Sequence, residues 1–178
     1  MAITAGKPLL FILLSGLAAV LAGCGLTQKI TDGTVSMTKS IFYKQVKTLH
    51  LDFRAREAVN NNARGEALST VIRIYQLRDR KIFEETDYPS LFASDSQAIA
   101  ADAVAEKDIR LMPGGAVSVD MPMEKSAKYI AVAGMFMAPD QTRNNWRLVL
   151  TLDDLVPDKA RIIEAGNNRL TLIEDNEA

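Results

Sequence analysis

The chain has 178 residues, a formal net charge of −1, 48% hydrophobic side chains, one cysteine and one histidine. The near-neutral charge excludes binding to nucleic acid through a strongly basic surface. The single cysteine excludes a disulfide within the chain, and one histidine beside it is too few for a four-ligand zinc site of nitrogen and sulfur donors. Stability therefore has to come from a hydrophobic core, which a chain of this length can build as one domain.

The N-terminal segment has the layout of a secretory signal. Lys7 precedes the apolar run Pro8–Ala22, whose 15 residues are too few to cross a hydrocarbon core of roughly 30 Å, which takes about 20. The run ends in "LAGC", which resembles the lipobox of bacterial lipoproteins. We expect residues 1–23 to be a cleaved signal peptide and Cys24 to carry a diacylglycerol, attached through its nucleophilic thiolate, and an N-acyl chain on its amino group. The alternative is an incidental cysteine in an ordinary signal peptide or an uncleaved anchor.

Two segments separate the cysteine from the first predicted strand. Residues 24–33 contain turn formers without a hydrophobic period, which is typical of a tether between a lipid and a domain. Residues 34–45 place apolar side chains at helical spacing and predict a short amphipathic helix. We expect residues 34–178 to form a single domain that begins with this helix.

Two strand patterns follow, separated by a polar segment. Leu49, Leu51 and Phe53 alternate with polar residues, which predicts a half-buried strand. Residues 68–79 are β-branched and apolar on both faces apart from Arg73 and Gln76, which suits an interior strand.

The polar segment between these strands predicts a long exposed loop. Hairpin loops usually have two to five residues, and this one is longer without being apolar, so it is a candidate binding surface. Its residues are Asn60, Asn61, Asn62, Ala63, Arg64, Gly65, Glu66 and Ala67.

The second half of the chain predicts one helix and several strands. Ser94 and Gln97 have the spacing of a capping box for an alanine-rich helix over about residues 95–105. The "PGG" turn at residues 113–115 predicts a hairpin between the strands on either side of it. Three further strands are predicted, within residues 127–137, 144–152 and 167–175, and Trp146 of the second points inward. About seven strands with short connections predict a mainly β, mostly antiparallel sandwich.

Residues that carry catalysis or bind metals are scarce. His50 lies on the polar face of its strand beside Asp52, where a solvated imidazole is the usual interpretation. Asp153 and Asp154 lack the spacing of a calcium loop and predict a charged turn. Catalysis by a histidine-assisted nucleophile is therefore poorly supported.

Two methionine pairs are the remaining lead for a metal. Met121 with Met123, and Met135 with Met137, each place two thioethers on one strand face, and thioethers favour Cu(I). Against copper, Met135 and Met137 flank Phe136 in the most apolar strand, where methionine normally fills gaps in the core.

Several motifs together resemble the TssJ family, also called SciN or VasD, which comprises outer-membrane lipoproteins of type VI secretion systems. They follow a lipobox in the same order and at similar spacing over nearly the whole chain after residue 23. These motifs are Arg73-Ile74-Tyr75-Gln76-Leu77, Tyr129 with Val132 and Ala133, and Asn145-Trp146-Arg147.

The resemblance implies a transthyretin-like antiparallel β-sandwich of about seven or eight strands with short helical insertions and no enzymatic activity. It implies a partner, the periplasmic C-terminal region of the inner-membrane protein TssM, contacted through the first inter-strand loop, here Asn60–Ala67. It also implies attachment to the periplasmic face of the outer membrane, and Gly25, in place of an aspartate that favours inner-membrane retention, agrees with this. No cofactor, nucleic acid or small-molecule substrate is expected beyond the acyl groups on Cys24.

Three alternatives remain open at this point. A pilotin-like assembly lipoprotein would share the anchor and the sandwich but bind another envelope protein. A periplasmic Cu(I)-binding lipoprotein would use the methionine pairs. A carbohydrate-binding sandwich would need exposed aromatic side chains, whereas Trp146 is in phase with the inward set.

Overall fold

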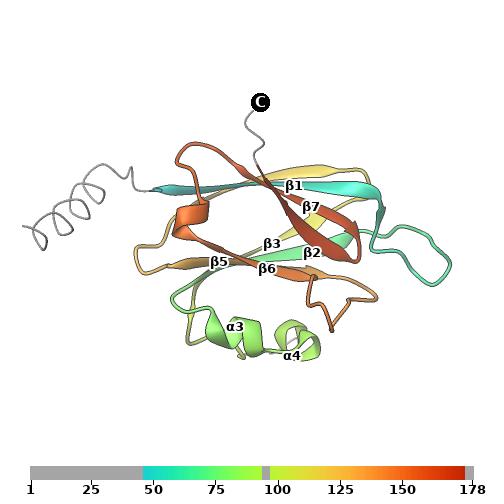
Figure 1. Cartoon of the computed structure of the whole chain (residues 1–178), viewed down its shortest axis with the longest axis horizontal. Coiled ribbons are helices and arrows are strands. Elements are labelled where there is room, and N and C mark those ends of the chain that lie inside the picture. The colour runs from blue at the N-terminus through green and yellow to red at the C-terminus, as the bar shows by residue number, and fades with distance from the viewer. Residues whose placement is uncertain (1–45, 94–96, 175–178) are drawn as a thin grey trace, which may run out of the picture. The chain divides into compact units, whose positions relative to one another are not determined.

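The computed structural model describes residues 46–93 and 97–174, which form two four-stranded β-sheets packed face to face (Figure 1). One sheet has the strand order β4-β1-β7-β8 and the other has the order β3-β2-β5-β6. The strands are β1 (Thr48–Val59), β2 (Thr70–Leu77), β3 (Ala103–Leu111), β4 (Ala116–Pro122), β5 (Tyr129–Met135), β6 (Arg147–Thr151), β7 (Arg161–Asn167) and β8 (Arg169–Ile173). The predicted mainly β sandwich is confirmed.

Strand β1 lies inside its sheet and follows the predicted alternation. Leu49, Leu51 and Phe53 are fully buried between the sheets, while His50 and Asp52 lie on the opposite face. Strand β1 pairs antiparallel with β4 and parallel with β7. The parallel β1–β7 pair differs from the mostly antiparallel pattern that short connections predict. Short connections indicate only how strands that follow each other in sequence pair, and β1 and β7 are far apart in the sequence.

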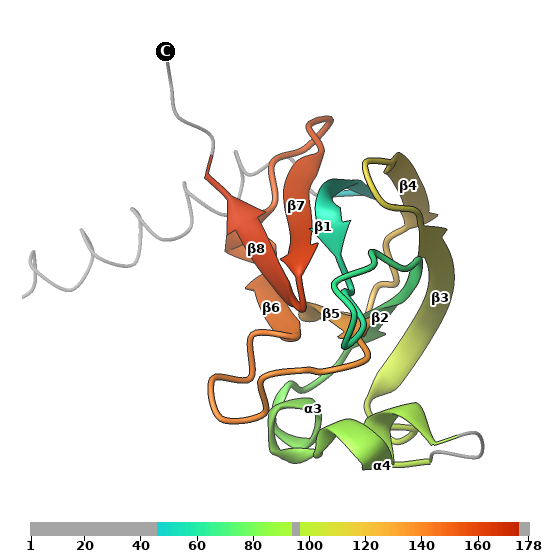
Figure 2. The same cartoon turned by 90° about the vertical axis from the view of Figure 1, so that its right-hand side faces the viewer.

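Strand β2 has the interior position that its composition predicts, with β3 on one side and β5 on the other. Ile72 and Ile74 are fully buried. Tyr75 is also buried, and its ring packs edge-on against Phe83 of helix α3 (Lys81–Glu85), with 5.8 Å between the ring centroids. Both faces of β2 are therefore covered, one by the other sheet and one by helices (Figures 1 and 2).

The helices α3 and α4 (Tyr88–Phe92) lie on the outer face of the β3-β2-β5-β6 sheet. Helix α4 begins at Asp87, whose carboxylate accepts the backbone N–H of Ser90 at 2.8 Å. The Tyr88 ring contacts Trp146 edge-on at 5.0 Å between centroids. Trp146 is fully buried, as predicted, and α4 supplies part of its surroundings.

The helix predicted over residues 95–105 is wrong over its C-terminal part. Residues 98–102 form turns, and Ala103 and Ala105 already belong to β3, where they pair with Leu77 and Gln76. Alanine favours a helix by only a few tenths of a kcal/mol per residue, so a full ladder to β2 outweighs that preference. Ser94 lies outside the described residues.

The hairpin predicted at residues 113–115 is also wrong. Strands β3 and β4 flank this turn but belong to different sheets, so the chain crosses from one layer to the other here. A turn motif fixes the local backbone, and Gly114 does adopt a positive φ of 65°, but it does not determine which strand the next segment pairs with.

The sequence did not predict strand β7, although its residues Ile163 and Ala165 are fully buried. It forms a tight hairpin with β8 through Asn167, whose φ is 53°, and Asn168. The predicted helix over residues 34–45, the tether over 24–33, Cys24 and Gly25 lie outside the described residues. Within residues 46–93 and 97–174, no helix is long and apolar enough to span a membrane.

Candidate functional site

Four connections meet at one end of the sandwich. Strands β1, β3, β5 and β7 all run toward this end, and β2, β4, β6 and β8 start from it, as the pairing directions require. The connections are residues 60–69, 112–115, 136–146 and 167–168. We call this end the loop end. The loop over residues 60–69 projects from it, on the far side from the start of β1 (Figures 1 and 2).

The tip of the β1–β2 loop is closed by its own hydrogen bonds. The Asn62 side-chain oxygen accepts the backbone N–H groups of Arg64 at 2.9 Å and Glu66 at 3.0 Å. The Asn62 amide nitrogen donates to the Glu66 carboxylate at 2.7 Å. Gly65 has a φ of 80°, a conformation that residues with a Cβ rarely adopt. The tip is thus an ordered turn that presents a defined surface.

The base of the loop is fixed by Asn60. Its side-chain nitrogen donates to the Ser69 carbonyl at 2.9 Å, and its side-chain oxygen accepts the Met137 N–H at 2.7 Å. Its backbone N–H donates to the Asn167 carbonyl. Asn60 is 4% exposed and has a φ of 50°. This one residue therefore joins three of the four connections of the loop end.

The predicted loop residues divide into two groups. Ala63, Arg64, Gly65 and Glu66 are exposed and available to a partner, whereas Asn60 is buried and holds the loop in place. Asn61, Asn62 and Ala67 are half-buried. The sequence pattern predicted the loop segment but did not separate its exposed residues from buried Asn60. Asn60 forms hydrogen bonds with residues far away in the sequence, and such contacts leave no pattern in the residues around it.

Buried amide oxygens without a hydrogen-bond partner gather at the loop end. Among the described residues they belong to Asn61, Asn145 and Asn168, which lie in the β1–β2, β5–β6 and β7–β8 connections respectively. Most buried polar atoms in proteins are paired, and an ordered water molecule at each of these three oxygens would satisfy it.

The methionine pairs occupy different places. Met121 is buried on β4 opposite Leu49, near the start of β1, whereas Met135 is 36% exposed at the end of β5. Met137 is 65% exposed, and only Phe136 between them is buried. The interpretation of Met135 and Met137 as core side chains is therefore wrong. The two pairs lie in different sheets at opposite ends, so they do not form one four-thioether site.

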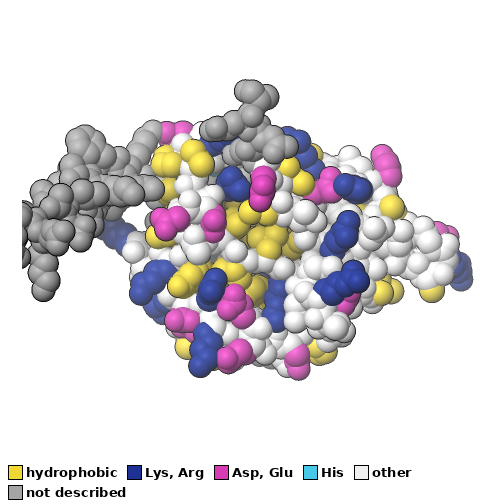
Figure 3. Space-filling model, in the orientation of Figure 1, with side chains coloured by type: hydrophobic (Ala, Val, Ile, Leu, Met, Phe, Trp, Pro, Cys, Tyr) yellow, Lys and Arg dark blue, Asp and Glu magenta, His cyan; other side chains and the backbone are white. Residues whose placement is uncertain are grey.

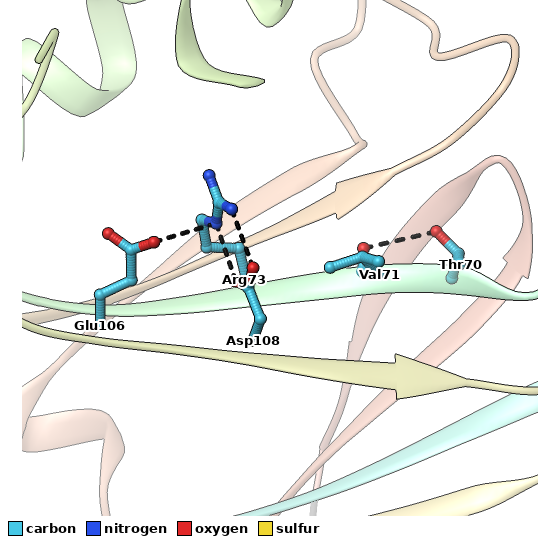
Figure 4. Close-up of polar contacts among 5 residues, drawn as sticks. All are labelled: Thr70, Val71, Arg73, Glu106 and Asp108. Carbon is cyan, nitrogen blue, oxygen red and sulfur yellow. Dashed lines mark hydrogen bonds and ion pairs between the residues drawn. The ribbon is translucent and has the colours of Figure 1, made fainter. Parts of the chain in front are cut away.

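Arginines fix the outer face of the second sheet. The Arg73 guanidinium binds Asp108 on β3 through two hydrogen bonds of 2.7 and 2.8 Å and approaches Glu106 at 3.1 Å (Figure 4). The hydrogen bond with Asp108 raises the pKa of Arg73. Burial raises the pKa of Tyr75 to about 12, and a hydrogen bond with Arg73 opposes that rise.

Arg147 holds helix α3 onto the sheet. Its guanidinium donates to the carbonyls of Phe83, Glu84 and Thr86 at 2.5 to 2.6 Å, and it lies 4.6 Å from the centroid of the Trp146 ring. Burial lowers its pKa. Arg147 is the first residue of β6 and directly follows the 136–146 connection, so these contacts lie next to the loop end.

The residues considered for catalysis or metal binding are accounted for by local contacts. His50 bonds with Asp120 across the β1–β4 pair, where the Asp120 side chain is 71% exposed. Asp154 accepts the N–H and hydroxyl of Thr151, both at 2.7 Å, in a capping box for the 3₁₀ turn η1 (Leu152–Asp154), and these bonds lower its pKa. In the part of the chain that the structure describes, no three or more His, Cys, Asp or Glu side chains are grouped as metal ligands.

The fold and the loop end define a β-sandwich that presents a rigid loop surface. The family is settled by comparison with known proteins: the model described as "Type VI secretion lipoprotein, VasD, EvfM, TssJ, VC_A0113" matches residues 47–168, and the chain belongs to this family of membrane-bound type VI secretion lipoproteins. The TssJ resemblance stated above is confirmed. A comparison with curated protein sequences gives no match.

Solved structures agree with this assignment. A chain from the structure described as "T6SS protein TssM C-terminal domain (869-1107) from EAEC" is 51% identical, with a TM-score of 0.67, over 72% of this chain and 99% of that one. A chain of a "Type VI membrane complex" is 53% identical, with a TM-score of 0.71, over 73% and 100%.

Two more distant structures share the fold. TssJ1 from Pseudomonas aeruginosa is 19% identical, with a TM-score of 0.61, over 71% of this chain and 95% of that one. Lip from Serratia marcescens, a membrane-bound component of the type VI secretion system, is 22% identical, with a TM-score of 0.64, over 74% and 100%.

Proposed function

We propose that this lipoprotein binds the periplasmic C-terminal region of TssM through the exposed tip of its β1–β2 loop, and that it ties TssM to the periplasmic face of the outer membrane. Its role is to anchor and help assemble the type VI membrane complex, without catalysis. The observation that carries the proposal is the ordered loop tip at the end of the sandwich opposite the start of β1. The 51% identical chain comes from a structure named for the TssM C-terminal domain, which supports the choice of partner.

The direction of β1 separates the loop end from the point where the chain enters the sandwich. Strand β1 has 12 residues, which at about 3.3 Å each span roughly 35 to 40 Å. The chain enters β1 at Thr48 and leaves it at Val59, beside the loop. The loop end therefore lies at the far end of β1 from the point where the chain enters the sandwich.

The loop tip suits a partner because its shape exists before binding. Its internal hydrogen bonds fix the backbone, so little conformational entropy is lost when TssM docks. Exposed Arg64 and Glu66 provide opposite charges for orientation.

The test of the binding site is a pair of charge reversals. Arg64→Glu should weaken binding to the purified TssM C-terminal region at least about tenfold, whereas Lys125→Glu in the β4–β5 turn, at the opposite end of the sandwich, should leave the dissociation constant unchanged. Calorimetry measures both. Equal affinities for wild type and Arg64→Glu would place the interface away from the tip, and no binding by wild type would refute TssM as the partner.

The anchor requires more than one acyl chain, because a single chain gives only reversible attachment. Cys24→Ser should abolish labelling by radioactive palmitate and release the protein from membranes, with an unchanged circular dichroism spectrum. Sorting is tested by density-gradient separation of the membranes: wild type should follow the outer membrane, and Gly25→Asp should shift the protein toward the inner membrane. Palmitate labelling of Cys24→Ser, or wild type found in inner membranes, would contradict the proposal.

A further inference from the structure

Three exposed methionines lie at the loop end. Met112, Met135 and Met137 are 56%, 36% and 65% exposed and are the exposed large apolar side chains of this end among the described residues. We call them the methionine surface. The β1–β2 loop tip beside them carries no large apolar side chain, so the methionine surface supplies the apolar character that the tip lacks.

Strand pairing places the three methionines next to the base of the β1–β2 loop. Met135 pairs with Val71 on β2, and Leu111 pairs with Thr70. Met112 directly follows Leu111 at the end of β3, and Met137 lies two residues beyond the end of β5. Thr70 directly follows the β1–β2 loop, so all three methionines lie where β3 and β5 border the base of that loop.

Hydrogen bonds join the methionine surface to the loop. The Thr70 hydroxyl donates to the Met135 carbonyl at 2.7 Å, and the Met137 N–H donates to the Asn60 side chain at 2.7 Å. The backbone under the methionines is therefore fixed relative to the loop tip. Their unbranched side chains retain rotational freedom and can adapt to the shape of a partner.

Three of the seven exposed large apolar side chains of the described residues lie at the loop end. On the face seen in Figure 3, basic and acidic side chains alternate around a central group of hydrophobic side chains, with no large region of one charge. Methionine is enriched at protein interfaces relative to other surface, and interfaces place an apolar centre beside a polar rim. The methionine surface and the charged loop tip have this arrangement.

We propose that the methionine surface forms the apolar half of the TssM-binding site and receives an apolar side chain of the TssM C-terminal region, next to the polar contacts of the loop tip. This inference rests on the proposed function and assigns residues that the loop alone does not include. The partner segment is expected to carry leucine, isoleucine or phenylalanine toward the methionines, because these side chains fill an adaptable thioether surface well.

The test replaces methionines by lysine in the purified lipoprotein, held in detergent, and measures binding to the TssM C-terminal region by calorimetry. The double variant Met112→Lys/Met137→Lys should weaken binding at least about tenfold, and Met112→Leu/Met137→Leu should bind within about threefold of wild type. Val156→Lys, 43% exposed in the β6–β7 connection at the opposite end, is the matched control and should bind like wild type. Unchanged melting temperatures show that the variants fold.

The outcomes separate the inference from the proposed function. If Arg64→Glu loses affinity while the lysine double variant keeps it, the methionine surface is not part of the interface and the inference is overturned, although TssM binding stands. If wild type does not bind TssM, the proposed function itself fails. Titration with Cu(I) under anaerobic conditions addresses the alternative use of thioethers. Submicromolar Cu(I) binding that the lysine variant loses, together with unchanged TssM binding, would assign a copper site instead.

Discussion

Replacing Asn60 by alanine tests whether this residue organises the loop end. The variant removes the side-chain bonds to the Ser69 carbonyl and the Met137 N–H, and leaves both backbone groups unpaired in a region where Asn60 itself is 4% exposed. An unpaired buried group costs about 1–3 kcal/mol. Alanine at a φ of 50° adds about 1 kcal/mol of backbone strain. We expect Asn60→Ala to lower the free energy of unfolding by about 4 kcal/mol.

Two further variants separate these contributions. Asn60→Gly tolerates the positive φ and should recover about 1 kcal/mol relative to alanine. Asn167→Ala is the control, since Asn167 has a φ of 53° but is exposed, so it should cost about 1 kcal/mol in strain with little added loss. Urea unfolding followed by Trp146 fluorescence measures all three. A loss below 1 kcal/mol for Asn60→Ala, or equal stability of Asn60→Gly and Asn60→Ala, would refute this account of the loop base.

Three other predictions concern the sheets and helices. Arg147→Met should cost about 2–4 kcal/mol in urea unfolding and change Trp146 fluorescence, because three carbonyls around the end of α3 lose their donor; wild-type stability would contradict this role. Tyr75 has its pKa raised from 10.0 to about 12, so the unfolded chain ionises first and stability should fall by about 2–3 kcal/mol between pH 10 and pH 12. Tyr75→Phe should flatten that loss in alkaline melting curves, and an unchanged pH dependence would show that another group causes it. Gly134→Ala should lower the urea midpoint by an amount equivalent to about 1–3 kcal/mol, because the new Cβ would lie 2.5 Å from the ring of buried Phe136; an unchanged midpoint would show that the ring moves freely.

The strands that alternate or are fully apolar could be predicted from sequence. The alternation around Leu51 and the apolar composition around Ile74 each reflect burial, which is a property of the strand itself. The pairing of β1 with β7 and the crossing between β3 and β4 could not be predicted, because they depend on which distant segment completes each sheet. Residues 98–105 show the same limit, since pairing with β2 overrides their helical preference.

The candidate site could be predicted as a segment but not as a surface. Loop length and polarity identify residues 60–67, and Gly65 does adopt the positive φ that a turn of this kind requires. The burial of Asn60 and the exposure of Met137 follow from contacts between connections that are far apart in sequence. A methionine in an apolar stretch carries no mark that distinguishes a core position from an exposed one at the end of a strand.

The course of β1 has a mechanical consequence for the domain. A pull between the start of β1 and the β1–β2 loop acts along one strand that is already extended, and an extended chain has almost no further length to give. Tension then passes through the covalent backbone of that strand, while its ladders to β4 and β7 keep it in place on both sides. Because a load along β1 does not separate the two sheets, the domain can transmit force without unfolding.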